Sequence, residues 1–194
     1  MKADGRVRRL LYASPVMLAK ISGGLYLINI VTSLIAFSGK GSDSMLAASG
    51  MTATASYVAV TILLYYLFKP VHAGLSFLAA IFSLAGSAAG VLGRQLVPFH
   101  LHSLVFFGCY CLLIAILILR SNFLPKFLGW LMALAGVGWL TFVSPPLADS
   151  LSPYHYTAGG IGEGLLTVWL LFRGVDAVRW KQQASHGIYA AGSN

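Results

Sequence analysis

Charged residues are scarce in this chain of 194 residues: 9% are Asp, Glu, Lys or Arg, while 58% are apolar. A soluble domain carries about a quarter of charged residues, because its surface must face water. The five acidic residues cannot cover the surface of a globule of this size. The apolar composition excludes a disordered chain, and the presence of only two cysteines excludes a secreted disulfide scaffold. The sequence therefore predicts an integral membrane protein.

Long apolar runs are abundant. A helix needs about 20 apolar residues to cross the hydrocarbon core of a bilayer, and six runs approach that length. A β-barrel would instead alternate apolar and polar residues, and no such alternation occurs. Prolines lie between the runs, where helices begin or end. We therefore expect an all-α bundle of six transmembrane helices, with the runs at 16–37, 52–68, 72–93, 100–119, 127–143 and 157–172.

The basic residues predict how this bundle is oriented. With the N-terminus inside, eleven basic residues fall on the inner side, and only Lys40 and Arg94 fall on the outer side. Cytoplasmic loops carry the excess of Lys and Arg, so both termini are predicted to be cytoplasmic. The same positions argue against nucleic acid as a partner of this chain with net charge +8, because the charges sit between apolar runs and not on one face.

The two ends of the chain are expected to lie at the inner membrane surface. Residues 1–15 are predicted to form a basic interfacial segment, 16–174 the transmembrane domain and 175–194 a short cytoplasmic tail, with Trp180 as a surface anchor. The alternative for the first run is a cleaved signal peptide. Its 22 residues exceed the usual 7–15-residue apolar region of such peptides, and it contains Lys20 and Asn29, which favours a retained helix.

Glycines recur four residues apart, at Gly86 and Gly90 and again at Gly160 and Gly164. This spacing puts each pair on one helix face, where small residues let helices approach closely in lipid. Gly129, Gly136 and Gly138 are expected to do the same in the fifth helix. The alternative for 159–164 is a discontinuous, ligand-binding helix. Cys109 and Cys111, which are two residues apart, point to different faces, so neither a disulfide nor a zinc pair is predicted.

Glu163 is the only acidic residue inside a predicted span, about six residues or ~9 Å from the start of its run. An ionised carboxylate that faces lipid is costly. We therefore expect Glu163 to face the bundle interior, to be protonated, or to hold a cationic partner.

The candidate partners of Glu163 gather on the outer side. We expect Glu163 to lie within direct or water-mediated reach of at least one of Arg94, His100 and His102, and the binding candidates also include Tyr154 and His155. His100 and His102 cannot share a helix face, so only one of them is expected to look inward. No metal site is predicted, because no HExxH or comparable spacing of ligands occurs, and the sequence identifies no cofactor.

Two functions fit this outer polar cluster. The first is a non-enzymatic membrane component, a subunit or small transporter, in which Glu163 is a structural or ion-binding group. The alternative is a membrane-embedded enzyme for a lipid or isoprenoid-like substrate, with Glu163 as general acid and with His102 or Arg94 tuning it or holding an anionic head group. We favour the first, because an enzyme site usually shows more than one clear pair of catalytic groups. Oligomers and partner subunits remain open.

The second half of the chain resembles a known family. The resemblance rests on His100, Phe106-Phe107-Gly108, Ile118-Leu119-Arg120-Ser121, Leu124-Pro125-Lys126, Leu128-Gly129, and Glu163 followed by 169–174 (WLLFRG), with 23–27 (GGLYL) in the first helix. This pattern is similar to a bacterial family of six-helix membrane proteins known as a domain of unknown function, number 4386. The resemblance implies a bacterial cytoplasmic (inner) membrane location and six helices, and it brings no activity with it.

Overall fold

The computed structural model describes residues 14–92 and 102–191, and the regular structure within these residues is helical throughout. The elements are α2 (Pro15–Ser38), α3 (Asp43–Phe68), α4 (Ala73–Leu92), α5 (Ser103–Arg120), α6 (Lys126–Leu140), the 3₁₀ turn η2 (Thr141–Val143), α7 (Pro145–Ser150), α8 (Tyr154–Phe172) and α9 (Ala177–Ala191).

Five of these helices are long and apolar enough to cross a membrane: α2, α3, α4, α5, and α6 continued to Val143. This confirms the prediction of a helical membrane protein. The sixth apolar run corresponds to α8, which has 19 residues but is not among the five. Its glycines, Glu163 and the polar residues of its first turns lower its hydropathy, so its membrane crossing does not follow from composition alone.

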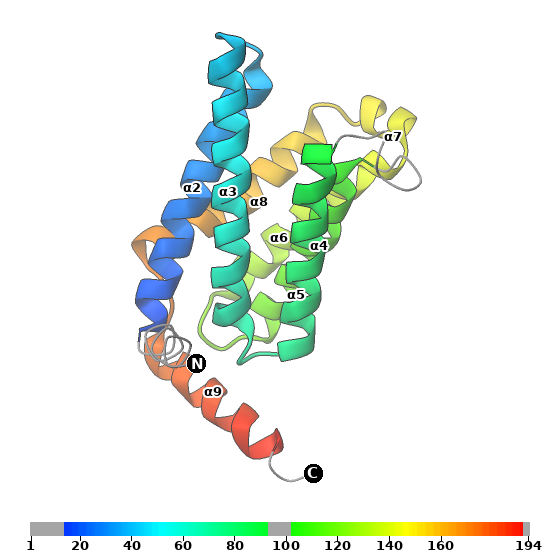
Figure 1. Cartoon of the computed structure of the whole chain (residues 1–194). Helices are drawn as coiled ribbons and strands as arrows, with labels where there is room; N and C mark the ends of the chain where they lie inside the picture. The colour runs from blue at the N-terminus through cyan, green and yellow to red at the C-terminus, as the bar shows by residue number, and fades with distance from the viewer. Residues whose placement is uncertain (1–13, 93–101, 192–194) are drawn as a thin grey trace.

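The five candidate spans α2 to α6 and the helix α8 form a closed ring. Each packs on the next along the chain, and α8 packs against both α6 and α2. Figure 1 shows α8 crossing diagonally behind the bundle, between the blue α2 and the green α6. Side chains of α8 that point inward therefore meet side chains from both halves of the chain.

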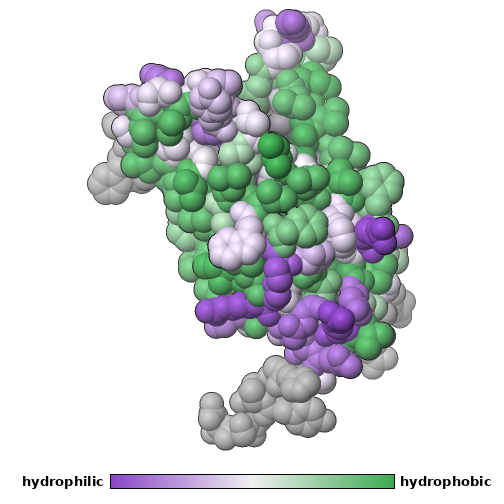
Figure 2. Space-filling model, turned by 180° about the vertical axis from the view of Figure 1, so that it is seen from behind, coloured by the Kyte–Doolittle hydropathy of each residue, from purple (hydrophilic) through white to green (hydrophobic). Residues whose placement is uncertain are grey.

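Charge separates the two ends of this ring. One end, where α3 and α5 terminate and from which α9 leaves, carries most of the described basic residues, and we call it the basic end. The opposite end, with α7, carries Lys40, Asp43 and Asp149. In Figure 2 a broad apolar band lies between the two polar ends. The basic end holds Lys69, Arg120, Lys126, Arg173, Arg179 and Lys181.

Trp180 is part of the core and not a surface anchor, so that expectation is wrong. Its side chain is only 2% exposed, and its indole N–H donates to the carbonyl oxygen of Leu67 at 2.8 Å. Gly174, with φ of 68°, makes the turn that brings α9 back onto the bundle. The amphipathic start of α9 thus closes the core at the basic end.

Part of the predicted glycine packing is confirmed. A Cβ atom at Gly86 would lie 3.0 Å from the ring of Phe107 on α5, and Gly129, Gly136 and Gly138 of α6 are similarly close to α5 or α8. Gly90 and Gly160 do not pack in this way. A Cβ atom at Gly160 would meet nothing within 4 Å, and one at Gly90 would only touch Ser103 at 4.0 Å. At Gly162, in contrast, a Cβ atom would lie 2.5 Å from the carbonyl oxygen of Leu131 on α6. The close approach of α8 to α6 therefore uses a different face of α8 from the one that the four-residue spacing indicated.

Candidate functional site around Glu163

Glu163 lies near the middle of α8, with its side chain half-buried against the bundle. Because α8 begins at Tyr154, three residues before the predicted run, Glu163 is nine residues or ~13.5 Å from the helix start. It is therefore deeper than the sequence indicated. The site belongs to the centre of the bundle and not to its outer edge.

Both carboxylate oxygens of Glu163 accept hydrogen bonds. The hydroxyl of Tyr26 on α2 donates to Oε2 at 2.8 Å, and the indole N–H of Trp139 on α6 donates to Oε1 at 2.6 Å. The thiol of Cys111 on α5 also donates to Oε1, with 3.7 Å between sulfur and oxygen. Three helices thus hold one carboxyl group through neutral donors. Among the described residues the only ion pair is Arg179–Asp176, at the basic end.

Tyrosines surround this carboxyl group on the side of α3 and α5. The ring of Tyr57 makes edge contacts with Tyr26 and Tyr110, at centroid distances of 5.7 and 5.9 Å. Tyr110 is 1% exposed, and its hydroxyl has no hydrogen-bond partner within the described residues. Tyr110 belongs to the same buried cluster as Tyr26, Tyr57, Cys111 and Glu163. A buried hydroxyl that can still donate and accept therefore lies beside the carboxyl group.

Glycines make room for the partners of Glu163. A Cβ atom at Gly159, one turn before Glu163, would overlap the indole of Trp139, so the indole can lie against the α8 backbone only because residue 159 has no side chain. On α2, a Cβ atom at Gly23 would lie 2.5 Å from the backbone nitrogen of Leu171. That close approach sits one turn before Tyr26 and brings its hydroxyl to the carboxylate.

A second cluster lies at the opposite end, around His155. This side chain is 4% exposed, and neither ring nitrogen has a hydrogen-bond partner in the described part of the chain. Its ring packs against Phe142 and Tyr156, with centroids 4.8 and 4.2 Å away. His102 precedes α5, where its Nδ1 accepts from the backbone N–H of Leu104 at 3.2 Å, and its ring lies 5.0 Å from that of Phe142.

The structure divides the predicted site. Glu163 hydrogen bonds to Tyr26, Trp139 and Cys111, while His102 and His155 gather on Phe142. His155 is eight residues before Glu163, ~12 Å along the helix axis. Arg94 and His100 lie outside the described residues. Tyr154 is 73% exposed and is not brought into either cluster.

Sequence reasoning missed all three partners of Glu163. Trp139 and Tyr26 carry a weak signal, since an aromatic donor inside a span usually needs a partner. Cys111 carries none. No group of three or more metal-ligating side chains occurs among the described residues.

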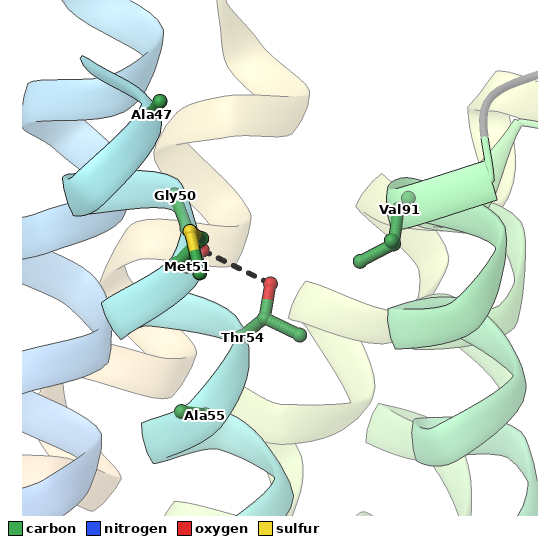
Figure 3. A pocket seen from close by; sticks show the side chains of 7 residues that line it. Ala47, Gly50, Met51, Thr54, Ala55 and Val91 are labelled. Carbon is green, nitrogen blue, oxygen red and sulfur yellow. Dashed lines mark hydrogen bonds between the residues drawn. The ribbon is translucent and has the colours of Figure 1, made fainter. Parts of the chain in front are cut away.

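A groove between α3 and α4 lies apart from these clusters. It has a volume of about 680 Å³ in the half of the bundle towards the opposite end. Figure 3 shows small and apolar side chains along it, with the hydroxyl of Thr54 turned back to the carbonyl oxygen of Gly50 at 3.0 Å. No titratable side chain lines this groove. Its lining residues are Ala47, Gly50, Met51, Thr54, Ala55, Gly90 and Val91.

Fold and site together define a multi-pass helical membrane protein with a carboxyl group held by neutral donors inside its bundle. Comparison with known proteins shows the family. Residues 95–174 match the model of a domain of unknown function (DUF4386), and the chain belongs to this family. An uncharacterized protein of Archaeoglobus fulgidus is 30% identical over 131 residues, which cover 60% of this chain and 76% of the relative. No solved structure matches the chain.

Proposed function

We propose that this protein is a six-span component of the bacterial cytoplasmic membrane in which Glu163 reversibly binds a proton. It acts as a small proton-coupled transporter, or as the proton-handling subunit of a larger complex, and not as an enzyme. The observation that carries the proposal is the set of hydrogen bonds from Tyr26, Trp139 and Cys111 to both oxygens of Glu163.

Neutral donors suit a group that changes its charge. A carboxylate accepts hydrogen bonds on both oxygens, whereas a carboxylic acid must also donate one. The hydroxyl of Tyr26 can turn from donor to acceptor, and Tyr110 offers a second acceptor nearby. Within residues 14–92 and 102–191, no ion pair has to break when the proton arrives. Intramembrane carboxyl groups commonly mark proton pathways, which fits this role.

The location of the charges supports the proposed topology. Both α2 and α9 meet the bundle at the basic end, which we assign to the cytoplasm. The 19 residues of α8 give it a length of ~28 Å, close to the ~30 Å core of a bilayer. Reporter fusions after Lys40 and Ser150 should report the outer side, and fusions after Lys69, Lys126 and Lys181 the inner side. An inner-side signal at Ser150 would overturn the six-span topology.

The enzyme alternative gave His102 or Arg94 the role of tuning Glu163 or of holding an anionic head group, and Arg94 lies outside the described residues. His102 instead caps α5 with its Nδ1 and packs on Phe142. The hydrogen bonds from Tyr26, Trp139 and Cys111 to Glu163 are the observation that favours the non-enzymatic function.

Proton uptake in proteoliposomes tests the proposal. With a potassium gradient and valinomycin imposing a membrane potential, an internal pH dye should report proton entry for the parent protein. Glu163→Gln keeps an acceptor oxygen but cannot ionise, so uptake should fall to the level of empty vesicles. Asp149→Asn, which removes an exposed carboxylate on α7, is the matched control and should retain uptake. Equal uptake by Glu163→Gln and the parent would refute the proton-binding role.

A further inference from the structure

We infer that a proton reaches Glu163 from the opposite end of the bundle, through the space that the Trp139 indole occupies, with His155 as the proton-binding group nearest to that end. The inference rests on the proposed function in so far as Glu163 is taken to carry a proton. The direction of access and the role of Trp139 rest on packing alone.

The half of the bundle between Glu163 and the basic end is closely packed and mostly apolar. Its buried hydroxyls already have hydrogen-bond partners, at Ser22, Thr61, Ser76 and Ser83. The side chains that follow Glu163 inward on α8, Leu166 and Leu170, are fully buried. The hydroxyl of the intervening Thr167 donates to the backbone oxygen of Glu163 and is satisfied. Water and protons do not cross such a region without a large cost. The neighbouring helices add the fully buried side chains Leu64, Leu67, Phe68, Ile114, Leu117, Ile118, Leu128 and Met132.

The half towards the opposite end contains polar atoms without partners. Neither ring nitrogen of His155 is bonded, and the Tyr110 hydroxyl at the level of Glu163 is also free of partners in the described residues. Each such atom costs about 1–3 kcal/mol unless water or a bound group satisfies it. Water or a proton that enters this half of the bundle therefore meets unpaired donors and acceptors. Among the described residues, unpaired buried polar atoms thus lie at the level of Glu163 and towards the opposite end, whereas the buried hydroxyls towards the basic end are paired.

Trp139 lies between His155 and Glu163. Its indole covers Gly159, midway between them on α8, and its ring contacts Tyr156 at 6.0 Å and Phe142 at 6.4 Å. An indole N–H can donate but cannot accept, so Trp139 cannot relay a proton. The indole must therefore move for a proton or water to pass, which makes Trp139 a gate.

His155 is the titratable group best placed outside this gate. The other titratable side chains near it are Tyr154 and Tyr156 on its own helix and His102 on α5, which it meets across Phe142. Phe142 and Trp139 contribute no titratable atom. The apolar groove between α3 and α4 offers no alternative proton route, because none of its lining residues titrates.

Cys111 is a native reporter for this access, since its sulfur lies 3.7 Å from Glu163. In a Cys109→Ser background, vesicles of known orientation are treated on one side with a membrane-impermeant methanethiosulfonate reagent, and the labelling rate is measured by mass spectrometry. Trp139→Ala should raise labelling from the opposite end by about tenfold or more. Trp139→Phe, which keeps a ring but loses the donor, should raise it less and guards against misfolding of the alanine variant.

Leu170→Ala is the matched control, because it opens space on the basic side of Glu163. It should leave labelling from the basic end unchanged. Faster labelling from the basic end than from the opposite end, in the parent or in any variant, overturns the direction of access. Unchanged labelling in both Trp139 variants overturns the gate. Neither readout depends on proton transport, so a failed transport assay with normal labelling would refute only the proposed function.

The role of His155 is tested by hydrogen–deuterium exchange of the Glu163 carboxyl group, followed by its infrared C=O band, which Glu163→Gln identifies. His155→Phe should slow this exchange by about tenfold. Tyr154→Phe, beside it but exposed, should leave the rate unchanged. An unchanged rate in His155→Phe would remove His155 from the route.

Discussion

Glu163 and His155 are two ionisable side chains of α8 that differ in their hydrogen bonding. Glu163 is half-buried and has three hydrogen-bond donors, contributed by α2, α5 and α6. His155 is more completely buried, yet both of its ring nitrogens lack partners in the described structure. The first side chain holds helices together, and the second is held by aromatic packing alone.

The comparison teaches that the burial of a polar side chain and the pairing of its hydrogen-bonding atoms are separate properties. Hydrogen bonds to a buried carboxyl group offset part of its desolvation free energy, whereas a buried imidazole without hydrogen bonds lowers stability. Substitutions at the two positions should therefore change the free energy of unfolding in opposite directions. Reversible unfolding in mixed detergent micelles measures this quantity for every variant below.

The largest effect is expected for Glu163→Leu. It leaves Tyr26, Trp139 and Cys111 with unpaired donors, and the free energy of unfolding should fall by about 3–5 kcal/mol. Glu163→Gln, which keeps an acceptor oxygen, should lose about 1 kcal/mol. If the two variants were equally stable, the hydrogen bonds to Glu163 would not be holding the helices.

The next effect separates two glycines of α8. Gly162→Ala places a Cβ atom against the Leu131 carbonyl oxygen and should cost about 1–3 kcal/mol. Gly160→Ala faces open space and should be neutral or slightly stabilising, because alanine favours the helix. The reverse order would show that α8 packs through its other face.

His155→Phe should raise the free energy of unfolding by about 1–2 kcal/mol. The change keeps a ring of similar shape between Phe142 and Tyr156 and removes two unpaired polar atoms. A loss of stability would mean that the imidazole nitrogens are satisfied in the membrane, and the contrast with Glu163 would disappear.

The smallest effect compares two tyrosines. Tyr26→Phe removes a hydroxyl that donates to Glu163 and should cost about 1 kcal/mol. Tyr110→Phe removes a buried hydroxyl without a partner in the described residues and should raise stability slightly, by up to about 1 kcal/mol. Equal costs at both positions would reveal a bond to Tyr110 and weaken the case for access from its side.

The helical architecture was predictable because each apolar run is bounded by proline or charge. The site was less predictable. Glycines at 159, 160, 162 and 164 cover more than one face of α8, so spacing alone cannot choose the contact face. The large indole of Trp139 makes that choice, because it requires the bare backbone at Gly159.

The depth of Glu163 was also misjudged for a local reason. Pro145 and Pro146 begin the short α7, and α8 then starts at Tyr154, ahead of the apolar run. The polar first turn of α8 does not register as membrane helix in the sequence. Glu163 is therefore central, and it meets side chains of three other helices whose register no local pattern encodes.

The bond from Trp180 to Leu67 also has a consequence for the order in which the protein is made. Leu67 leaves the ribosome early, at the end of α3, whereas Trp180 is synthesised after every apolar helix. The basic end of the bundle can close only when translation is nearly complete. We therefore expect the basic end of the bundle to stay open in nascent chains that stop before α9. The late helices can then take their places in the ring.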